Sequence, residues 1–164
     1  MSRLKGKRII VVGAGSGIGA ATVRRLAGEG ARVCVADINT EGANTVAQQV
    51  CDSGGEAYPV AIDLADKRTV DEAVAFSVER LGGLDGAHIN AADLRVIMED
   101  SDAETVSLDI FDRTIDVNLK GHLLCTRAVL PHLLANDSGA IVYTSSSAAD
   151  AGEPVRPSYA MSKS

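Results

Sequence analysis

The sequence predicts an α/β fold in which a doubly wound parallel sheet is covered by helices on both faces. Short runs rich in β-branched residues alternate with longer segments whose apolar residues recur every three or four positions, as repeated βαβ units require. The short runs are almost continuously apolar, which is typical of strands buried on both faces. A length of 164 residues with 46% hydrophobic content fits one globular domain.

Five strands are expected, because five apolar runs lie between turn-forming residues of the glycine, asparagine, aspartate and serine types. In chain order these strands cover Arg8–Val12, Arg32–Asp37, Ala57–Ala61, Gly86–Asn90 and Ala140–Ser145.

Four helices are expected between the strands, because apolar residues recur there at helical spacing and glycines stand near the ends. They cover Gly17–Gly28, Thr40–Ser53, Asp66–Leu81 and Leu108–Asn136. The stretch Asp93–Ser107 breaks this alternation. Its acidic residues favour a solvated lead into the fourth helix, and a loop beside the functional site is the alternative. The fourth helix carries an apolar stripe that packs in the core or against a second subunit, consisting of Leu119, Leu123, Leu124, Val129 and Leu133.

The composition excludes several classes of function. Lys and Arg number 16 against 22 Asp and Glu, and the net charge of -6 would repel nucleic acid and anionic lipid. The three cysteines form no Cys-x-x-Cys pair, which argues against a disulfide framework or a zinc site and favours a reducing cytoplasm. No metal site is expected, and the apolar runs are too short for a signal peptide or a membrane span.

A glycine-rich loop joins the first strand to the first helix. It contains Gly13, Gly15, Ser16, Gly17, Ile18 and Gly19. Backbone N–H groups and the helix dipole converge at such a loop, where a pyrophosphate can bind, although a tight strand-to-helix turn needs glycine for structural reasons too. The context favours dinucleotide binding, because the loop lies between a strand and a helix and a second strand follows that helix.

Asp37 ends the second strand, 20 residues after Gly17. A carboxylate at this place binds the two hydroxyls of an adenosine ribose and repels a 2'-phosphate. No Arg or Lys stands at Ala14, Ser16 or Ile38 to receive such a phosphate, so NAD is favoured over NADP. The alternative for Asp37 is a helix N-cap or a turn residue.

Tyr159 and Lys163 stand four residues apart and share one face if a helix begins near Pro157 and Ser158. A tyrosine is a poor base near neutral pH. A lysine charge about 4 Å away stabilises a phenolate by about 4 kcal/mol at an effective dielectric constant near 20. The spacing alone is weak support, because it occurs by chance in many chains.

Taken together, these motifs resemble the classical short-chain dehydrogenase/reductase family along essentially the whole chain. The glycine spacing matches at Gly13, Gly17 and Gly19, although Val12 stands where many members have Thr. Asn90 and Ala91 match the motif after the fourth strand, whereas Ile89 and Ala92 depart from its Asn-Asn-Ala-Gly form. The other matches are Asp63-Leu64, the segment Asp116–Gly121 with Asn118, and the segment Tyr143–Ser147, in which Ser146 lies thirteen residues before Tyr159.

The resemblance implies a Rossmann-type sheet with strand order 3-2-1-4-5 and hydride transfer between NAD(H) and a secondary alcohol or ketone. In the roles that it implies, Tyr159 is the acid/base and Lys163 stabilises its phenolate and orients the ribose. Ser146 hydrogen-bonds the substrate oxygen, and Asn118 supports a proton relay. The implied cofactor contacts are those of Gly13, Gly15, Ser16, Gly17, Ile18, Gly19, Asp37, Ile38, Asp63, Leu64, Asn90, Ala91, Tyr159 and Lys163.

Members of this family continue well beyond the Tyr-x-x-x-Lys motif. Residues 1–164 are therefore expected to form a single NAD(P)-binding domain that lacks the family's C-terminal strands and the segment that closes over substrate. Ala140–Ser145 would then be an exposed apolar edge strand. The full-length form is expected to be a homo-oligomer, a dimer or a tetramer. The alternatives are a nucleotide-binding fragment without turnover and a non-catalytic interaction module.

Overall fold

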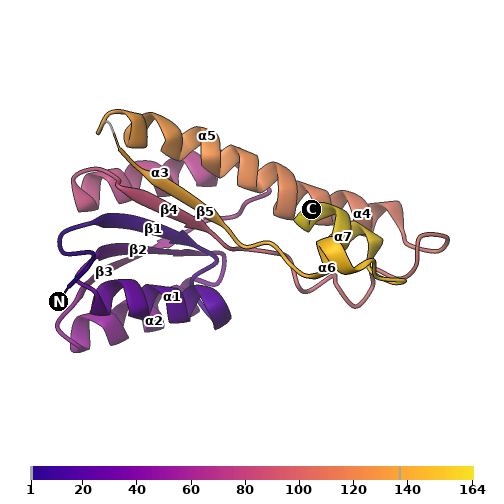
Figure 1. The fold of residues 1–164 in the computed structure, drawn as a ribbon, viewed down its shortest axis with the longest axis horizontal. Coiled ribbons are helices and arrows are strands. Elements are labelled where there is room, and N and C mark those ends of the chain that lie inside the picture. The colour runs from indigo at the N-terminus through magenta and orange to yellow at the C-terminus, as the bar shows by residue number, and fades with distance from the viewer. Residues whose placement is uncertain (1, 137) are drawn as a thin grey trace.

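Five parallel strands lie in the order β3-β2-β1-β4-β5, with helices on both faces, in a computed structural model that describes residues 2–136 and 138–164 (Figure 1). The predicted fold class and strand order are confirmed. The elements, in chain order, are β1 (Arg8–Val12), α1 (Gly17–Gly28), β2 (Arg32–Asp37), α2 (Thr40–Asp52), β3 (Glu56–Ala61), α3 (Lys67–Leu81), β4 (Gly86–Ile89), α4 (Leu108–Ile115), η1 (Asp116–Lys120), α5 (Gly121–Leu134), β5 (Ala140–Tyr143), α6 (Ala148–Ala151) and α7 (Pro157–Lys163).

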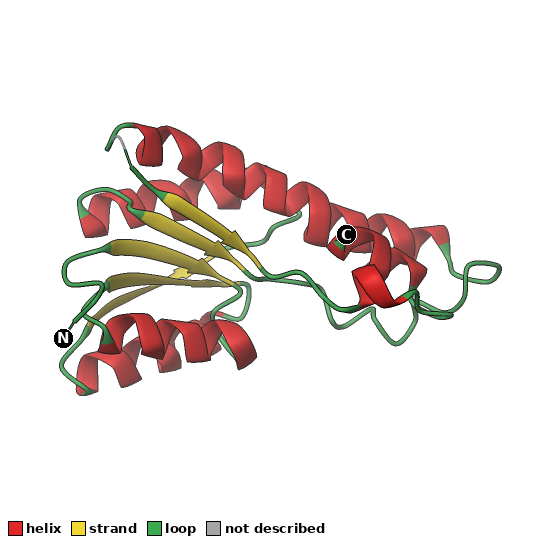
Figure 2. Ribbon diagram, viewed as in Figure 1, coloured by secondary structure: helices red, strands yellow, loops and turns green. Residues whose placement is uncertain are grey.

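The sheet separates two apolar cores, which explains why its strands lack polar alternation. Ile10 and Val12 of β1 point into the core shared with α3 and α5, whereas Val11 points into the core shared with α1 and α2. Figure 2 shows the two helical layers on either side of the sheet. Burial on both faces therefore fixes the ends of the central strands β1, β2 and β4, from which part of the site is built, whereas β3 and β5 at the two edges are more exposed.

The fourth predicted helix, Leu108–Asn136, is helical along almost its whole predicted length but is interrupted by a π-helical turn, η1. The reason lies in Asn118 at the middle of that turn, which is 1% exposed and bonds to two other segments of the chain. A π turn often marks such a functional insertion. Of the predicted stripe, Val129 and Leu133 are buried in the core, whereas Leu119 and Leu123 are exposed.

Two predicted strand ends and one loop need correction. Asn90 lies outside β4, because its side chain turns to the carbonyl of Gly13. Thr144 and Ser145 lie outside β5, because both are hydrogen-bonded to Lys163, Thr144 through its backbone carbonyl and Ser145 through its hydroxyl. The stretch Asp93–Ser107 is not a solvated lead into a helix. Its Asp93 and Asp100 are buried beside the site, so the alternative interpretation is correct.

The outer edge of the sheet at β5 is exposed, as predicted. Val142 and Tyr143 expose about half of their surface, at 56% and 48%. Within the described residues, no helix is long and apolar enough to cross a membrane. The same residues contain no group of three or more His, Cys, Asp or Glu side chains placed to hold a metal ion.

Candidate active site

A cleft of about 610 Å³ opens where the carboxyl ends of the strands meet α7. Ligand pockets typically measure about 300 to 1,000 Å³, so the cleft is large enough for a dinucleotide or a substrate. Gly15, Gly19, Asn118 and Ser146 are the only predicted site residues that do not line it. Those that line it are Gly13, Ser16, Gly17, Ile18, Asp37, Ile38, Asp63, Leu64, Asn90, Ala91, Tyr159 and Lys163.

The glycine loop is packed too tightly for side chains at its two ends. A Cβ on Gly13 would come within 2.6 Å of the Cα of Ala91, and a Cβ on Gly19 would overlap the carbonyl oxygen of Gly13. Gly17 differs, because it has a φ of +52° and no atom within 4 Å of where its Cβ would lie. Gly13 and Gly19 therefore bring the backbone segments together, and Gly17 leaves space open in the cleft.

The first turn of α1 faces this cleft without a side-chain cap. The N-caps of α2, α3 and α4 are Asn39, Asp66 and Ser107, and each accepts a bond from its own helix. Ser16 at the start of α1 accepts no such bond within the described part of the chain, and no acidic residue lies in that turn. The free N–H groups and the positive end of the helix dipole are the features that bind a phosphate.

Asp37 lies against the glycine loop at the end of β2. Its Oδ2 accepts from the backbone N–H of Gly15 at 2.7 Å, and its Oδ1 accepts from the N–H of Asn39 at 2.8 Å. A Cβ on Gly15 would come within 2.9 Å of the Asp37 carboxyl carbon. Each carboxylate oxygen keeps an acceptor position, so the fixed carboxylate can receive two hydroxyl groups from the cleft.

Asp63 and Leu64 follow β3 and line the same cleft. Oδ1 of Asp63 accepts from the N–H of Ala65 at 2.9 Å, and Leu64 is buried against Gly121. Ile38, directly after Asp37, leaves half of its surface exposed at the cleft. An acid and two apolar side chains in this arrangement can accept from an amino group and pack against a flat ring.

A chain of hydrogen bonds runs from His88 to the glycine loop. The Thr144 hydroxyl donates to Oδ1 of Asn90 at 2.9 Å, and Nδ2 of Asn90 donates to the carbonyl of Gly13 at 3.0 Å. The hydroxyl proton of Thr144 is thus used, so the 2.9 Å contact with His88 has Nε2 of the imidazole as its donor. Burial lowers the pKa of His88, which agrees with a neutral ring. This chain fixes Asn90, a predicted cofactor contact.

The helix α7 begins at Pro157, as predicted, and carries Tyr159 and Lys163 on one face. Lys163 is 6% exposed, and its Nζ donates to the carbonyl of Thr144 at 3.1 Å. No carboxylate among the described residues pairs with this ammonium, and burial lowers the pKa of Lys163. Tyr159 lines the same cleft, and no hydrogen bond joins its hydroxyl to another described residue, so this hydroxyl is available to a ligand.

Ser145 and Ser146 have different partners, although both follow β5. Oγ of Ser145 donates to the carbonyl of Lys163 at 2.8 Å. Oγ of Ser146 accepts from the N–H of Ala148 at 3.2 Å, so its own hydroxyl proton is still available. Ser146 lies outside the cavity lining, just before α6, which packs against α7.

Asn118 lies behind α7 and does not open into the cleft. Its Oδ1 accepts from the N–H of Asp93 at 2.9 Å, and its Nδ2 donates to Oγ of Ser162 at 3.1 Å. Ser162 in turn donates to the carbonyl of Tyr159 at 2.8 Å. The carboxamide thus links the loop after β4 to the helix of Tyr159.

An acidic residue with two arginines lines the cleft and was not predicted from the sequence. Asp93 accepts from Arg95 at 2.7 and 2.9 Å and from Nε of Arg113 at 2.9 Å. Hydrogen bonds from Arg95, and then from Arg113, hold the pKa of the buried Asp93 far below its ordinary value. A signal existed in the sequence, because Asp93 lies in the segment after a strand, as Asp63 does.

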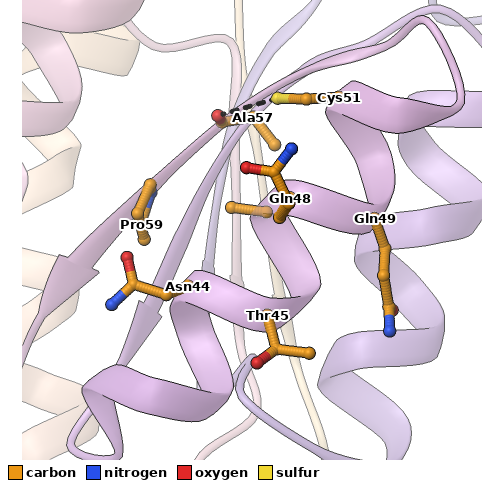
Figure 3. Close-up of a pocket in the computed structure, with 8 residues that line it drawn as sticks. Asn44, Thr45, Gln48, Gln49, Cys51, Ala57 and Pro59 are labelled. Carbon is orange, nitrogen blue, oxygen red and sulfur yellow. Dashed lines mark hydrogen bonds between the residues drawn. The ribbon is translucent and has the colours of Figure 1, made fainter.

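A second cavity, of about 500 Å³, lies between α2 and β3 (Figure 3). Amide side chains such as Asn44 and Gln48 line it, and Sγ of Cys51 lies 3.7 Å from the carbonyl of Ala57. None of the predicted site residues lies there. The cleft at the strand ends is therefore the candidate active site.

The fold and this cleft define a parallel α/β protein with a dinucleotide-type glycine loop and a Tyr-x-x-x-Lys helix at one site. The sequence model of the short chain dehydrogenase family matches residues 7–164. The chain belongs to this family, as the resemblance in its motifs predicted.

Relatives and solved structures agree with this assignment. A 2,5-dichloro-2,5-cyclohexadiene-1,4-diol dehydrogenase of Sphingobium indicum is 41% identical over 164 residues, covering 99% of this chain and 63% of that protein. A 7 alpha-hydroxysteroid dehydrogenase complexed with NADH and 7-oxo glycochenodeoxycholic acid has a TM-score of 0.91 at 30% identity, covering 98% of this chain and 61% of that one. An NAD+-bound xylitol dehydrogenase has a TM-score of 0.91 at 29% identity, with coverages of 98% and 61%. The chain thus spans about three fifths of the length of these proteins.

Proposed function

We propose that the protein is an oxidoreductase that interconverts a secondary alcohol and a ketone with NAD(H). One observation carries this proposal: the uncapped start of α1, the carboxylate of Asp37 and the free hydroxyl of Tyr159 all face a single cleft. The two named structural relatives with nicotinamide cofactors, which are bound to NADH and NAD+, support the cofactor class.

The residues present fit a dinucleotide. The pyrophosphate would lie at the N–H groups of Gly17 and Ile18, where Gly17 leaves the space that a side chain would fill. Asp37 would accept from the adenosine ribose, and Asp63 from the adenine amine. When bound, NAD supplies the hydride acceptor and NADH the hydride donor, at the nicotinamide ring.

The protein's own contribution is to move one proton at the substrate oxygen. As phenolate, Tyr159 takes the proton of the alcohol, and as phenol it returns the proton to a ketone. The buried ammonium of Lys163 has no carboxylate partner among the described residues, so its charge is available to stabilise that phenolate. The free hydroxyl proton of Ser146 donates to the substrate oxygen, and Asn118 supports the relay that returns protons to solvent.

Two alternatives remain to be distinguished. A nucleotide-binding protein without turnover would keep the features around α1 and Asp37 but would not depend on Tyr159. A non-catalytic interaction module would need neither. The presence of all four residues of the catalytic type in the expected order argues for the enzyme.

The deciding experiment is NAD reduction with a panel of secondary alcohols by the full-length protein. Tyr159→Phe should remove nearly all turnover and leave the dissociation constant of NADH within about two- to threefold. Tyr58→Phe is the matched control, because that hydroxyl pairs with Glu56 on β3, outside the cleft, and its loss should leave turnover unchanged. Turnover retained by Tyr159→Phe would refute the assigned role, and NADH binding with no turnover of any alcohol would favour the non-catalytic alternative.

We also propose a homo-oligomer in a reducing cytoplasm. Leu119, Leu123, Leu130 and Leu134 form an exposed apolar stripe along η1 and α5, which a second copy could cover. All three cysteines are free, which fits a reducing compartment. We further propose that residues 1–164 act as one NAD(P)-binding unit.

A further inference from the structure

The helix that carries Tyr159 and Lys163 has no cap of its own. Arg156 occupies the N-cap position of α7 in the left-handed region, with a φ of 63°, and no side-chain cap bond is found there among the described residues. The helix has only seven residues. So short a helix is not stable by itself, because the unfavourable free energy of nucleation exceeds the favourable free energy of one or two turns of helix.

Asp100 supplies the missing cap from the loop between β4 and α4. Its Oδ2 accepts from the backbone N–H of Tyr159 at 2.8 Å. Its Oδ1 accepts from the Ser158 hydroxyl at 2.8 Å and from the Ser158 N–H at 3.3 Å. Its backbone carbonyl accepts from the N–H of Arg156 at 3.1 Å. One buried residue, 3% exposed, thus bonds three of the four positions from the N-cap to Tyr159, and it shares the Arg156 N–H with the carbonyl of Ser101, at 2.7 Å.

A carboxylate is well suited to this position. The N–H groups at a helix start have no partners within the helix, and the helix dipole favours a negative charge beside them. The other end of α7 is fixed separately, by Lys163 on Thr144 and by Ser162 on Asn118. The contact with Asp100 therefore determines where the turn that begins at Tyr159 lies relative to the rest of the cleft.

From this geometry we propose that Asp100 is a positioning residue for Tyr159, and this inference rests on the function proposed above. Asp100 does not line the cleft. It holds the backbone from which the phenol projects, and a misplacement of about 1 Å at a reacting group costs about 100-fold in rate. Loss of this contact should therefore lower kcat while leaving the cofactor contacts at Asp37 and the glycine loop unchanged.

The same loop provides a matched control. Asp102 is exposed, and among the described residues its Oδ1 accepts from the N–H groups of Glu104 and Thr105 and from the Thr105 hydroxyl, all within its own turn. Asp102→Ala disturbs the loop without touching α7. Asp100→Asn is the conservative variant, because a carboxamide can accept from Tyr159 through oxygen and donate to the Ser158 hydroxyl through nitrogen.

Two measurements on the full-length protein test the proposal. Hydrogen exchange of the α7 amides should be at least about 10-fold faster in Asp100→Ala and unchanged in Asp102→Ala. In steady-state kinetics with NAD and a secondary alcohol, kcat should fall at least about 100-fold in Asp100→Ala, recover to within about 10-fold of wild type in Asp100→Asn, and stay unchanged in Asp102→Ala. The dissociation constant of NADH should stay within about twofold in all three variants.

Each contrary outcome has a definite meaning. Unchanged exchange or unchanged kcat in Asp100→Ala overturns the positioning role. Equal losses in Asp100→Ala and Asp102→Ala, or loss of NADH binding with the loss of kcat, also overturn it, because the effect is then on the loop or the fold. If the wild-type protein turns over no alcohol, the proposed function has failed instead, and the exchange experiment alone decides whether Asp100 holds α7.

Discussion

Asp37 offers a sharp test of the cofactor assignment, because its carboxylate can be removed in two ways. Asp37→Ala deletes the charge and leaves the N–H groups of Gly15 and Asn39 without their acceptor. Asp37→Asn deletes the charge but keeps one oxygen that can accept from one of the two. We expect both variants to reduce the preference for NAD(H) over NADP(H), the alanine variant more strongly.

The size of the effect follows from the geometry. A hydrogen bond to a charged group contributes about 1.5 to 3 kcal/mol, so losing the ribose contacts should weaken NAD(H) binding by about 2 kcal/mol. Two unit charges 4 Å apart repel by about 4 kcal/mol at an effective dielectric constant of 20, and solvent screening should reduce this repulsion to about 2 kcal/mol. Removing the Asp37 charge should therefore strengthen NADP(H) binding by about 2 kcal/mol. Together these changes should narrow the ratio of the two dissociation constants by about 100- to 1,000-fold.

Fluorescence titration of NADH and NADPH measures both dissociation constants, at low and at moderate salt. The discrimination by wild type should shrink as salt rises, because the repulsive part of it is screened. Asp71→Ala serves as the control, since this acid pairs with Lys67 on the outer surface of α3 and should not change the ratio. A wild-type preference for NADPH at moderate salt, or a ratio unchanged in both Asp37 variants, would refute the role given to this carboxylate.

Three further predictions concern stability and association. Lys163→Met should abolish turnover yet raise the free energy of unfolding by about 1 kcal/mol, or about 2 to 4 °C in Tm, because it removes a buried cation with no carboxylate partner among the described residues. Because burial lowers the pKa of Lys163, this gain in the free energy of unfolding should be complete at a pH below the folded-state pKa of Lys163. The gain should vanish as the pH rises to the ordinary pKa of a lysine, and thermal melts at a series of pH values measure it. Asp85→Asn should lower the free energy of unfolding by about 1 kcal/mol after discounting for solvent screening, because hydrogen bonds from Arg8 lower the pKa of Asp85 to about 2. The difference in this free energy between variant and wild type should be complete above the ordinary pKa of an aspartate and should disappear as the pH falls through about 2. Denaturant titrations at a series of pH values measure this difference. The polypeptide should associate through its exposed β5 edge, and Val142→Lys should increase its monomer fraction in size-exclusion chromatography, whereas a fully monomeric wild-type polypeptide would contradict this.

The parts of the site that sequence could predict are those whose signal is local. Strand runs, the glycine loop and the acids Asp37 and Asp63 each reveal themselves within a few residues, because a strand end and its polar follower are adjacent in sequence. Asp93 also follows a strand, but Asn90, Ala91 and Ala92 separate it from the end of β4. It escaped prediction because the acidic residues after it resemble a solvated segment, whereas two arginines neutralise its buried charge.

What sequence could not predict are contacts between distant segments. Nothing near Asp100 indicates that Tyr159, 59 residues later, binds its carboxylate. The π turn at Asp116–Lys120 has the same origin, because its Asn118 is held by Asp93 and by Ser162, which lie 25 and 44 residues away. Such features depend on the assembled fold and not on local propensity.

The way α7 is anchored has a consequence for the order of folding. Its bonds to Thr144, Asn118 and Asp100 span 19, 44 and 59 residues, so it depends on contacts that close large loops. The glycine loop and Asp37, by contrast, lie within one βαβ unit at the start of the chain. During synthesis this first βαβ unit can therefore form while the chain is still growing and receives Asn90 and Ala91 once β4 has docked, whereas α7 assembles only after β5 has docked.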